Sequence, residues 1–144
     1  MSILTRESHE FYLKRCIELS QSARDNGNTP FGALLVDAKG SILLEQENIE
    51  ITEHICTGHA ETSYTTAEPC AMCTGAIYWG NIGTIVFAMT EKRLLELTGD
   101  NDQNPTFNLP SSEIIARGQK DIQIIGPFPS VEVEAAAVHE GYWD

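Results

Sequence analysis

The chain is poor in positive charge. Lys and Arg number 9 against 21 Asp and Glu, so the formal net charge of its 144 residues is −12. A protein that follows a phosphate backbone normally presents a basic surface. The charge balance therefore argues against nucleic acid as a partner, and it favours high solubility.

Long apolar runs and paired cysteines are also scarce. No stretch of 18 apolar residues could span a bilayer, and the N-terminal residues contain no signal-peptide core. Cys16 and Cys56 stand alone and are expected to be small core residues, whereas Cys70 and Cys73 form a close pair. We expect a cytoplasmic protein with no membrane partner and no disulfide framework.

Hydrophobic periodicity and turn residues predict alternating helices and strands. This order favours a single α/β domain over residues 1–144, a three-layer α/β/α sandwich with a central mixed sheet of about five strands. Pro69 is expected at the first position of its helix, and Ser111 and Ser130 are expected to cap theirs. The expected helices are 3–26, 69–79, 91–97, 111–118 and 131–139, and the expected strands are 31–37, 41–47, 63–66, 82–88 and 121–125.

Residues 59–73 carry the clearest chemistry. They read His-Ala-Glu and, eight residues later, Cys-Ala-Met-Cys. Cys70 and Cys73 share a face at the start of a helix, where free N–H groups favour thiolates. With His59 as a third ligand, the set suits a catalytic zinc ion whose fourth position holds water or hydroxide. Glu61 is then free to act as the general acid and base.

Simpler interpretations exist for each part of this motif. The cysteine pair could be a redox pair or half of a structural zinc site, although the chain offers no second pair. His59 alone could be an ordinary histidine at a helix end, and Glu61 alone a solvated helix residue. The conjunction of all four residues in this order favours the catalytic zinc site. The other histidines, His9, His54 and His139, are expected at the surface or in loops.

With these residues in view, the chain resembles the cytidine and nucleobase deaminase superfamily, whose signature is His-x-Glu followed by Pro-Cys-x-x-Cys. The likeness spans about residues 8–90. Residues 65–77 look similar to the branch that holds guanine deaminases, fungal-type cytosine deaminases and tRNA adenosine deaminases, and residues 30–33 and 76–79 look most similar to bacterial guanine deaminases. The resemblance implies the cytidine deaminase fold, bound Zn²⁺ and a nucleobase or nucleoside as the small-molecule substrate.

The resemblance also implies roles for residues outside the zinc motif. Asn48 would hydrogen-bond the base, and the backbone of Ala60 would donate to it. Phe31 and Trp79 would line or stack on the substrate, although plain core packing would explain either ring equally well. The family is commonly dimeric, so we expect a homodimer. By analogy, the C-terminal residues 142–144 could complete the pocket, often that of a partner subunit, or could simply anchor the chain end.

One departure from the family pattern concerns the spacing after Glu61. A helix beginning near Thr57 could carry His59 and Glu61, but the family pattern has roughly twenty more residues before Cys70, enough for a full helix and a strand. Two explanations are open. Either the segment has been deleted from the protein, or the residue numbers run on continuously across a segment that the protein has but the sequence as written omits. The intact flanks favour the second explanation. Successive Cα atoms about 3.8 Å apart at residues 61–63 would support a deletion.

These observations predict a hydrolytic deaminase whose first candidate substrate is a free, guanine-like base. Zinc-bound hydroxide would attack the base, Glu61 would act as the proton shuttle, and ammonia would be released. Cytosine or cytidine is the second candidate within this class. Editing of tRNA adenosine fits the negative charge less well. A hypothesis from another class is a zinc-stabilised domain whose catalysis is impaired by the short segment after Glu61.

Overall fold

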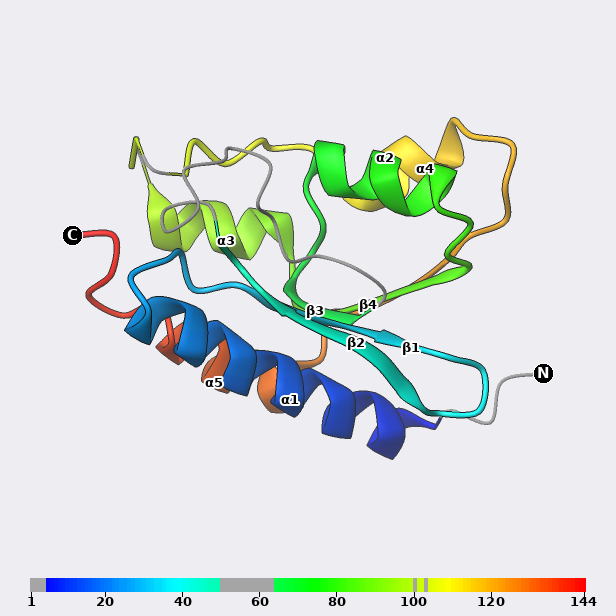
Figure 1. The fold of residues 1–144 in the computed structure, drawn as a ribbon. Coiled ribbons are helices and arrows are strands. Elements are labelled where there is room, and N and C mark those ends of the chain that lie inside the picture. The colour runs from blue at the N-terminus through cyan, green and yellow to red at the C-terminus, as the bar shows by residue number, and fades with distance from the viewer. Residues whose placement is uncertain (1–4, 50–63, 100, 103) are drawn as a thin grey trace.

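A computed structural model describes residues 5–49, 64–99, 101–102 and 104–144 of the chain. Helices and strands alternate along the described residues, as expected, and surround one sheet (Figure 1). The helices are α1 Arg6–Asp25, α2 Ala71–Trp79, α3 Glu91–Thr98, α4 Ser111–Ala116 and α5 Pro129–Ala137. The strands are β1 Gly32–Val36, β2 Ile42–Glu47, β3 Tyr64–Ala67, β4 Thr84–Met89 and β5 Gln123–Ile125.

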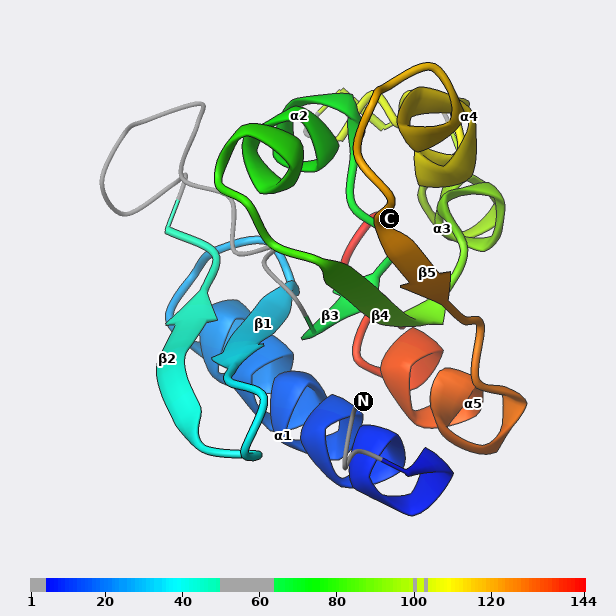
Figure 2. The ribbon, with the colours of Figure 1, turned by 90° about the vertical axis from the view of Figure 1, so that its right-hand side faces the viewer.

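The sheet has five strands in the order β2-β1-β3-β4-β5, which confirms the predicted mixed sheet. β1 pairs antiparallel with both β2 and β3, whereas β3, β4 and β5 run parallel to one another. Seen along the sheet, α1 and α5 lie on one face and α2, α3 and α4 on the other (Figures 1 and 2). The predicted three-layer α/β/α sandwich is therefore confirmed.

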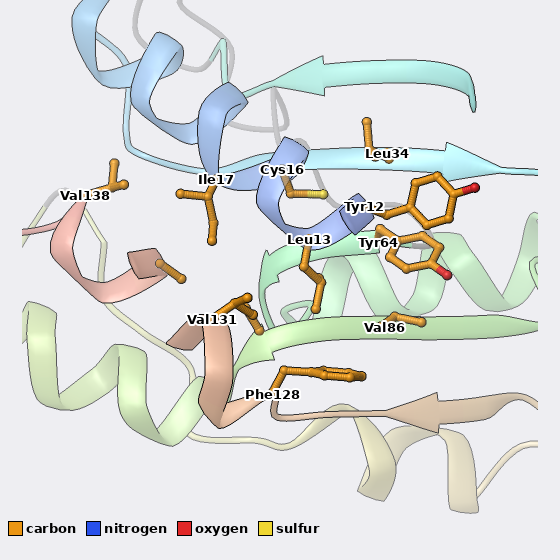
Figure 3. Packing of buried hydrophobic residues seen from close by; sticks show 12 residues of the cluster. Tyr12, Leu13, Cys16, Ile17, Leu34, Tyr64, Val86, Phe128, Val131 and Val138 are labelled. Carbon is orange, nitrogen blue, oxygen red and sulfur yellow. The ribbon is translucent and has the colours of Figure 1, made fainter. Parts of the chain in front are cut away.

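The main core lies between the sheet and the α1–α5 layer (Figure 3). Leu13 and Cys16 of α1 are fully buried against Leu34 of β1 and Val86 of β4. Gly32 allows α1 to approach this closely, because an added Cβ there would lie 2.3 Å from the carbonyl oxygen of Cys16. Burial of apolar surface on this face is the main stabilising contribution.

The second core lies on the opposite face, where α2 and α4 pack over β4. Successive residues of β4 serve the two cores in turn: Ile85 and Phe87 face α2 and α4, and Val86 and Ala88 face α1 and α5. A strand that is buried on both faces must be apolar throughout, which explains why residues 85–89 form an uninterrupted apolar run.

The β1–β2 hairpin is covered less evenly. Leu34 pairs in register with Glu45, on the face of α1, and Arg15 of α1 forms an ion pair with that carboxylate at 2.5 Å. Leu35 and its partner Leu44 therefore point to the opposite face. Leu35 is partly buried and Leu44 is 49% exposed, so this face of the hairpin is only thinly covered.

The starts of α1, α2 and α5 differ from the predicted ranges. α1 begins at Arg6 and not at residue 3, because the Thr5 hydroxyl accepts from the Ser8 N–H and caps the helix there. α2 begins at Ala71, two residues after Pro69, because the N–H of Glu68 still donates to the Met89 carbonyl and prolongs the strand pairing. Ser111 is the first residue of α4 and does not cap it, since its hydroxyl donates to Glu68.

The last helix, α5, starts at Pro129, a residue well suited to a first helical position. The hydroxyl of Ser130 bonds to Glu10 of α1 and does not cap the helix. Among the helices of the described ranges, none has the length and apolar character needed to cross a membrane.

Candidate active site

The two cysteines of the motif lie at the N-terminus of α2. Cys70 is the N-cap residue, with φ −66° and ψ 174°, and Cys73 is buried one turn further on. The N–H of Thr74 donates to the Cys70 carbonyl at 2.8 Å, which closes the first turn. The expected placement of Cys70 within the first helical turn is thus corrected by one position. Both sulfur atoms still belong to the helix end where thiolates are stabilised.

His59, Ala60 and Glu61 lie outside the described residues, as do the Cα spacings at residues 61–63. Within the described ranges, no three His, Cys, Asp or Glu side chains cluster closely enough to hold a metal. Two cysteines three residues apart at a helix N-terminus nevertheless fit part of a zinc ligand set by their chemistry. His59 and Glu61 therefore remain predictions as ligand and acid/base.

Phe31 and Asn48 lie at the same edge of the sheet as the cysteine turn. Phe31 precedes β1 and packs in a buried cluster with Ala67 and Met89, the last residues of β3 and β4. The N–H of Asn48 donates to the Phe31 carbonyl at 3.1 Å, and the Asn48 side chain is 2% exposed. This edge carries the carboxyl ends of parallel strands, where α/β proteins commonly bind ligands.

Trp79 lies at the other end of α2 from Cys70. A nine-residue helix is roughly 13 Å long, so the described structure does not bring this ring to Phe31. The Trp79 side chain is 78% exposed, and the Lys120 ammonium lies 5.6 Å from the ring centroid. Met72 and Ala76 of the same helix are exposed as well, which leaves an apolar outer face on α2.

The C-terminal tail folds back onto the edge that carries Phe31. The Trp143 ring is 9% exposed and its centroid lies 6.4 Å from that of Phe31. Asn101, in the loop after α3, donates to the Trp143 carbonyl at 2.8 Å. Arg24 of α1 donates to the carbonyls of Val138 and Glu140, at 2.7 Å each. The tail is thus an apolar anchor on its own chain and a neighbour of Phe31.

His139 is a residue that the sequence reasoning misplaced. It was expected in a loop or at the surface, but it is 3% exposed. Its Nδ1 accepts a hydrogen bond from the Trp143 indole at 3.0 Å, so the ring proton resides on Nε2, which is buried and has no hydrogen-bond partner among the described residues. Burial, reinforced by the charge of Arg24, lowers the pKa of His139 to about 4. His9 is also partly buried, and its Nδ1 shares a 2.6 Å hydrogen bond with Tyr64.

A further residue missed by sequence reasoning is Glu68, which lies between β3 and the cysteine turn and is 5% exposed. Glu68 stands beside the Pro-Cys motif, and a carboxylate that directly follows apolar strand residues is a sequence signal for a buried acidic group. Such a group can be buried only when hydrogen-bond donors surround it.

Comparison with protein families places the chain among deaminases. Residues 6–64 match the family model described as the cytidine and deoxycytidylate deaminase zinc-binding region. A probable cytosine deaminase from Schizosaccharomyces pombe is 33% identical over 92% of this chain and 91% of its own length. A guanine deaminase from Bacillus subtilis is 34% identical over 56% of this chain and 64% of its own length.

Solved structures show the same fold. A guanine deaminase from Nitrosomonas europaea superimposes with a TM-score of 0.73 at 20% identity, over 99% of this chain and 86% of its own. A crystal structure in complex with 8-azaguanine reaches a TM-score of 0.74 at 21% identity, over 93% of this chain and 83% of its own.

The alignments also bear on the spacer after Glu61. The one to the S. pombe protein runs over 150 positions, whereas 92% of 144 residues is about 132, so roughly 18 of its positions have no counterpart here. For the B. subtilis protein, 101 positions against 56% of the chain, about 81 residues, leave roughly 20. The family match includes His59 and Glu61 and ends at Tyr64, before the cysteines. These sizes agree with the segment that the family spacing leads us to expect.

The chain belongs to the cytidine deaminase superfamily, whose members carry a zinc-binding region and include nucleobase and nucleoside deaminases.

Proposed function

From this membership we propose that the chain is a zinc-dependent hydrolase that deaminates a free nucleobase, with guanine or a related purine as the first candidate. The observation that carries the proposal is the meeting of Cys70, Cys73, Phe31 and Asn48 at one edge of the sheet. Further support comes from structural neighbours that hold 8-azaguanine and 2,6-diaminopurine. In the proposed reaction, water replaces an exocyclic amino group of the base, and ammonia leaves.

His59, Cys70 and Cys73 would hold the zinc ion, with two thiolates balancing its charge. When bound, zinc supplies a Lewis acid that lowers the pKa of a water molecule toward neutrality. Glu61 would accept the proton of that water and deliver it to the ring nitrogen, then assist the departure of ammonia. A position at the N-terminus of α2 would favour the thiolate form that a metal requires.

The residues around the metal would orient the base. Asn48 would hydrogen-bond its edge, the backbone of Ala60 would donate a second bond, and Phe31 would form the apolar floor of the site. Phe31 suits this role because Trp143, Met89 and neighbouring side chains hold its ring in place. Trp79 could reach a substrate only across a subunit boundary, given its position on the outer end of α2.

A homodimer forms part of the proposal. The exposed apolar face of α2, formed by Met72, Ala76 and Trp79, would lie in the interface. Sedimentation of the wild type and of Trp79→Asp tests this, because a charge in an apolar interface should shift the protein toward monomer. We further propose that residues 1–144 act as one cytoplasmic domain.

Cytosine is the second candidate substrate, because the relative that matches over most of its length is a probable cytosine deaminase. Transfer RNA is a weaker candidate, since a net charge of −12 repels a polynucleotide. Ammonia release should be measured with guanine, cytosine, their nucleosides and adenosine-containing tRNA. Preference for guanine supports the leading proposal, and preference for cytosine or tRNA replaces it.

Glu61→Gln tests the assigned chemistry. The variant should retain zinc and lose roughly 100-fold to 10,000-fold in kcat, the usual contribution of a general acid/base. Glu113→Gln is the matched control, because Glu113 is an exposed carboxylate on α4. Undiminished turnover of Glu61→Gln would contradict its role. A wild type that holds zinc and deaminates no member of the panel would favour the impaired zinc-binding domain.

A further inference from the structure

Glu68 connects the cysteine turn to two helices that lie elsewhere in the sequence. Its carboxylate is buried, and both oxygens accept hydrogen bonds. Oε1 accepts from the N–H of Glu91 at 3.0 Å, and Oε2 accepts from the N–H and the hydroxyl of Ser111 at 2.8 Å each. Three donors around one carboxylate account for its burial, because bonds to an ionised acceptor are among the stronger ones in proteins.

The donors place Glu68 at a junction of the second layer. Glu91 is the first residue of α3, and Ser111 is the first residue of α4. The backbone N–H of Glu68 donates to the Met89 carbonyl at 2.8 Å, which joins the turn to the end of β4. One residue therefore holds the end of a central strand and the starts of two helices in a fixed relation.

Only Pro69 separates this junction from Cys70. The proline ring fixes its own φ angle, so the link between Glu68 and Cys70 has little freedom. On the far side, the Thr74 hydroxyl donates to the Pro69 carbonyl at 3.1 Å, and the Thr74 N–H donates to the Cys70 carbonyl. The turn that presents Cys70 is thus held by Glu68 before it and by Thr74 after it.

We propose that Glu68 is a positioning residue that sets the direction in which Cys70 and Cys73 present their sulfur atoms. The inference rests on the proposed zinc site, which requires both thiolates to meet one ion. Through Ser111, Glu68 also ties this geometry to the loop after α3, whose Asn101 bonds the C-terminal tail.

The competing interpretation is that Glu68 only caps α3 and α4 and has no influence on the thiols. Glu68→Gln separates the two. The amide is nearly the same size, but its NH₂ group must face an N–H donor, so at least one of the three bonds is lost. Thr90→Ala is the control, because the Thr90 hydroxyl caps the same α3 helix through the Arg93 N–H at 3.0 Å without touching the cysteine turn.

The first measurement uses metal-free protein and follows amide hydrogen exchange by NMR. Glu68→Gln should accelerate exchange at Glu91 and Ser111 and also at Thr74, whose N–H closes the cysteine turn. Thr90→Ala should affect α3 and leave Thr74 unchanged. If faster exchange in Glu68→Gln stops at Glu91 and Ser111, Glu68 is only a capping residue and the proposal is wrong.

The second measurement titrates the full chain with Co²⁺ as a spectroscopic substitute for zinc. Glu68→Gln should bind cobalt about 10-fold to 100-fold more weakly, as for other groups that orient metal ligands, with a shifted thiolate-to-cobalt absorption. Unaltered affinity and absorption would overturn the proposal. A wild type that binds no cobalt would refute the zinc site, and Thr74 exchange would still decide whether Glu68 holds the turn.

Should Glu68→Gln fail to fold, Ser111→Ala serves as the second variant. It removes one of the three bonds and keeps the carboxylate and both backbone donors. Ser111→Ala should change Thr74 exchange and cobalt absorption in the same direction as Glu68→Gln, by a smaller amount. No change in either reporter would count against the proposal.

Discussion

The two halves of the sheet are covered differently. Around β3 and β4 both faces are packed, with Val86 and Ala88 under α1 and α5 and with Ile85 and Phe87 under α2 and α4. In the β1–β2 hairpin, Leu34 of β1 is buried under α1, but β2 is exposed on both faces, since Leu43 is 62% and Leu44 49% exposed. Within the described residues, the β3–β4 half of the sheet is therefore covered on both faces and the β1–β2 half less completely.

The strand order shows which connection must pass beside the β1–β2 hairpin. β2 and β3 are both antiparallel to β1, so they run parallel to each other on its two sides. A connection between such strands crosses over the strand between them, usually as a helix, and needs a dozen or more residues. Here it consists of residues 48–63, and α1 already occupies one face. Most of this connection, residues 50–63, lies outside the described residues.

The relatives have roughly 18 to 20 positions that this chain lacks. A helix of that size would be about 27 to 30 Å long, enough to cover β1 and β2. The number of these positions is close to the roughly twenty additional residues that the family spacing leads us to expect between Glu61 and Cys70. The stability cost of a substitution at a buried position of the sheet can be compared with that of the same substitution at an exposed one.

The largest effect is expected from Leu34→Ala. Leu34 is fully buried between β1 and α1, so its truncation should lower the free energy of unfolding by about 2–5 kcal/mol. Leu44→Ala, the same substitution on the opposite face of the hairpin, should cost less than about 1 kcal/mol because half of that side chain is already in water. Urea unfolding of both variants checks this; equal losses would show that the second face is covered after all.

The stability of the fold should depend on pH through His139, which lies beside Phe31 and Trp143. The pKa of His139 is lowered to about 4 by burial, below its ordinary value of 6.5, so the unfolded chain binds a proton that the folded chain does not. Above pH 6.5 the neutral ring is the stable form in both states, so His139 does not lower the free energy of unfolding. As the pH falls to 4, protonation of the unfolded chain lowers that free energy by roughly 3 kcal/mol. His139→Gln removes the titration, so its stability should fall less over this range in pH-dependent urea unfolding. Parallel curves would contradict the neutral buried state.

An insertion after Glu61 separates the two explanations of the short spacer. We would insert a helix-forming segment of roughly 18 residues, the number of extra positions in the S. pombe alignment, between Glu61 and Thr62. If the segment has been deleted, the insertion should raise kcat/KM on the order of 100-fold, because catalysis is sensitive to changes of about 1 Å in the placement of catalytic groups.

The control for this insertion is a flexible segment of the same length rich in Gly and Ser. It lengthens the spacer without a helix and should not improve kcat/KM. In the helical variant, Leu44→Ala should become more costly, because the new helix would bury that side chain. An unchanged Leu44→Ala cost would place the added segment elsewhere.

The smallest effect is expected at the hairpin edge. Arg15 lowers the pKa of the Glu45 carboxyl through a direct side-chain hydrogen bond, so the ion pair adds stability above the ordinary pKa of Glu45, and that contribution is lost as the pH falls. Both side chains are more than a third exposed, so Glu45→Gln should cost under about 1 kcal/mol. Thermal unfolding at low and high salt should show the difference shrinking with salt.

Most of the fold was predictable because its local signals agree. The apolar face of α1, the turn between β1 and β2 and the apolar run of β4 each follow from periodicity or turn chemistry. The predicted start of α1 was wrong by three residues and those of α2 and α5 by two. Ser111 and Ser130 do not cap their helices, because long-range hydrogen bonds of Glu68, Ser111 and Ser130 compete with local capping. Sequence spacing carries no information about such distant partners.

The site was predictable only in part. Residue types and order identified Cys70 and Cys73 at a helix N-terminus, and the structure places them there. The burial of His139 and Glu68 was not foreseen, because it depends on Phe31 and Ser111, which are far from them in the sequence and come close only when the chain folds. Trp79 looked equally suited to a core or a pocket, and only its place on the outer end of α2 shows that it faces solvent.

The sequence by itself determined the chemistry of this protein: the identity and order of His59, Glu61, Cys70 and Cys73, and the net charge that favours a small substrate. These are properties of residue types and local spacing. Tertiary structure decided which donors hold the Glu68 carboxylate, where the C-terminal tail packs, and that Leu34 is fully buried while Leu44 is half exposed. Those outcomes require segments tens of residues apart to meet, and burial then sets the energy of each polar group.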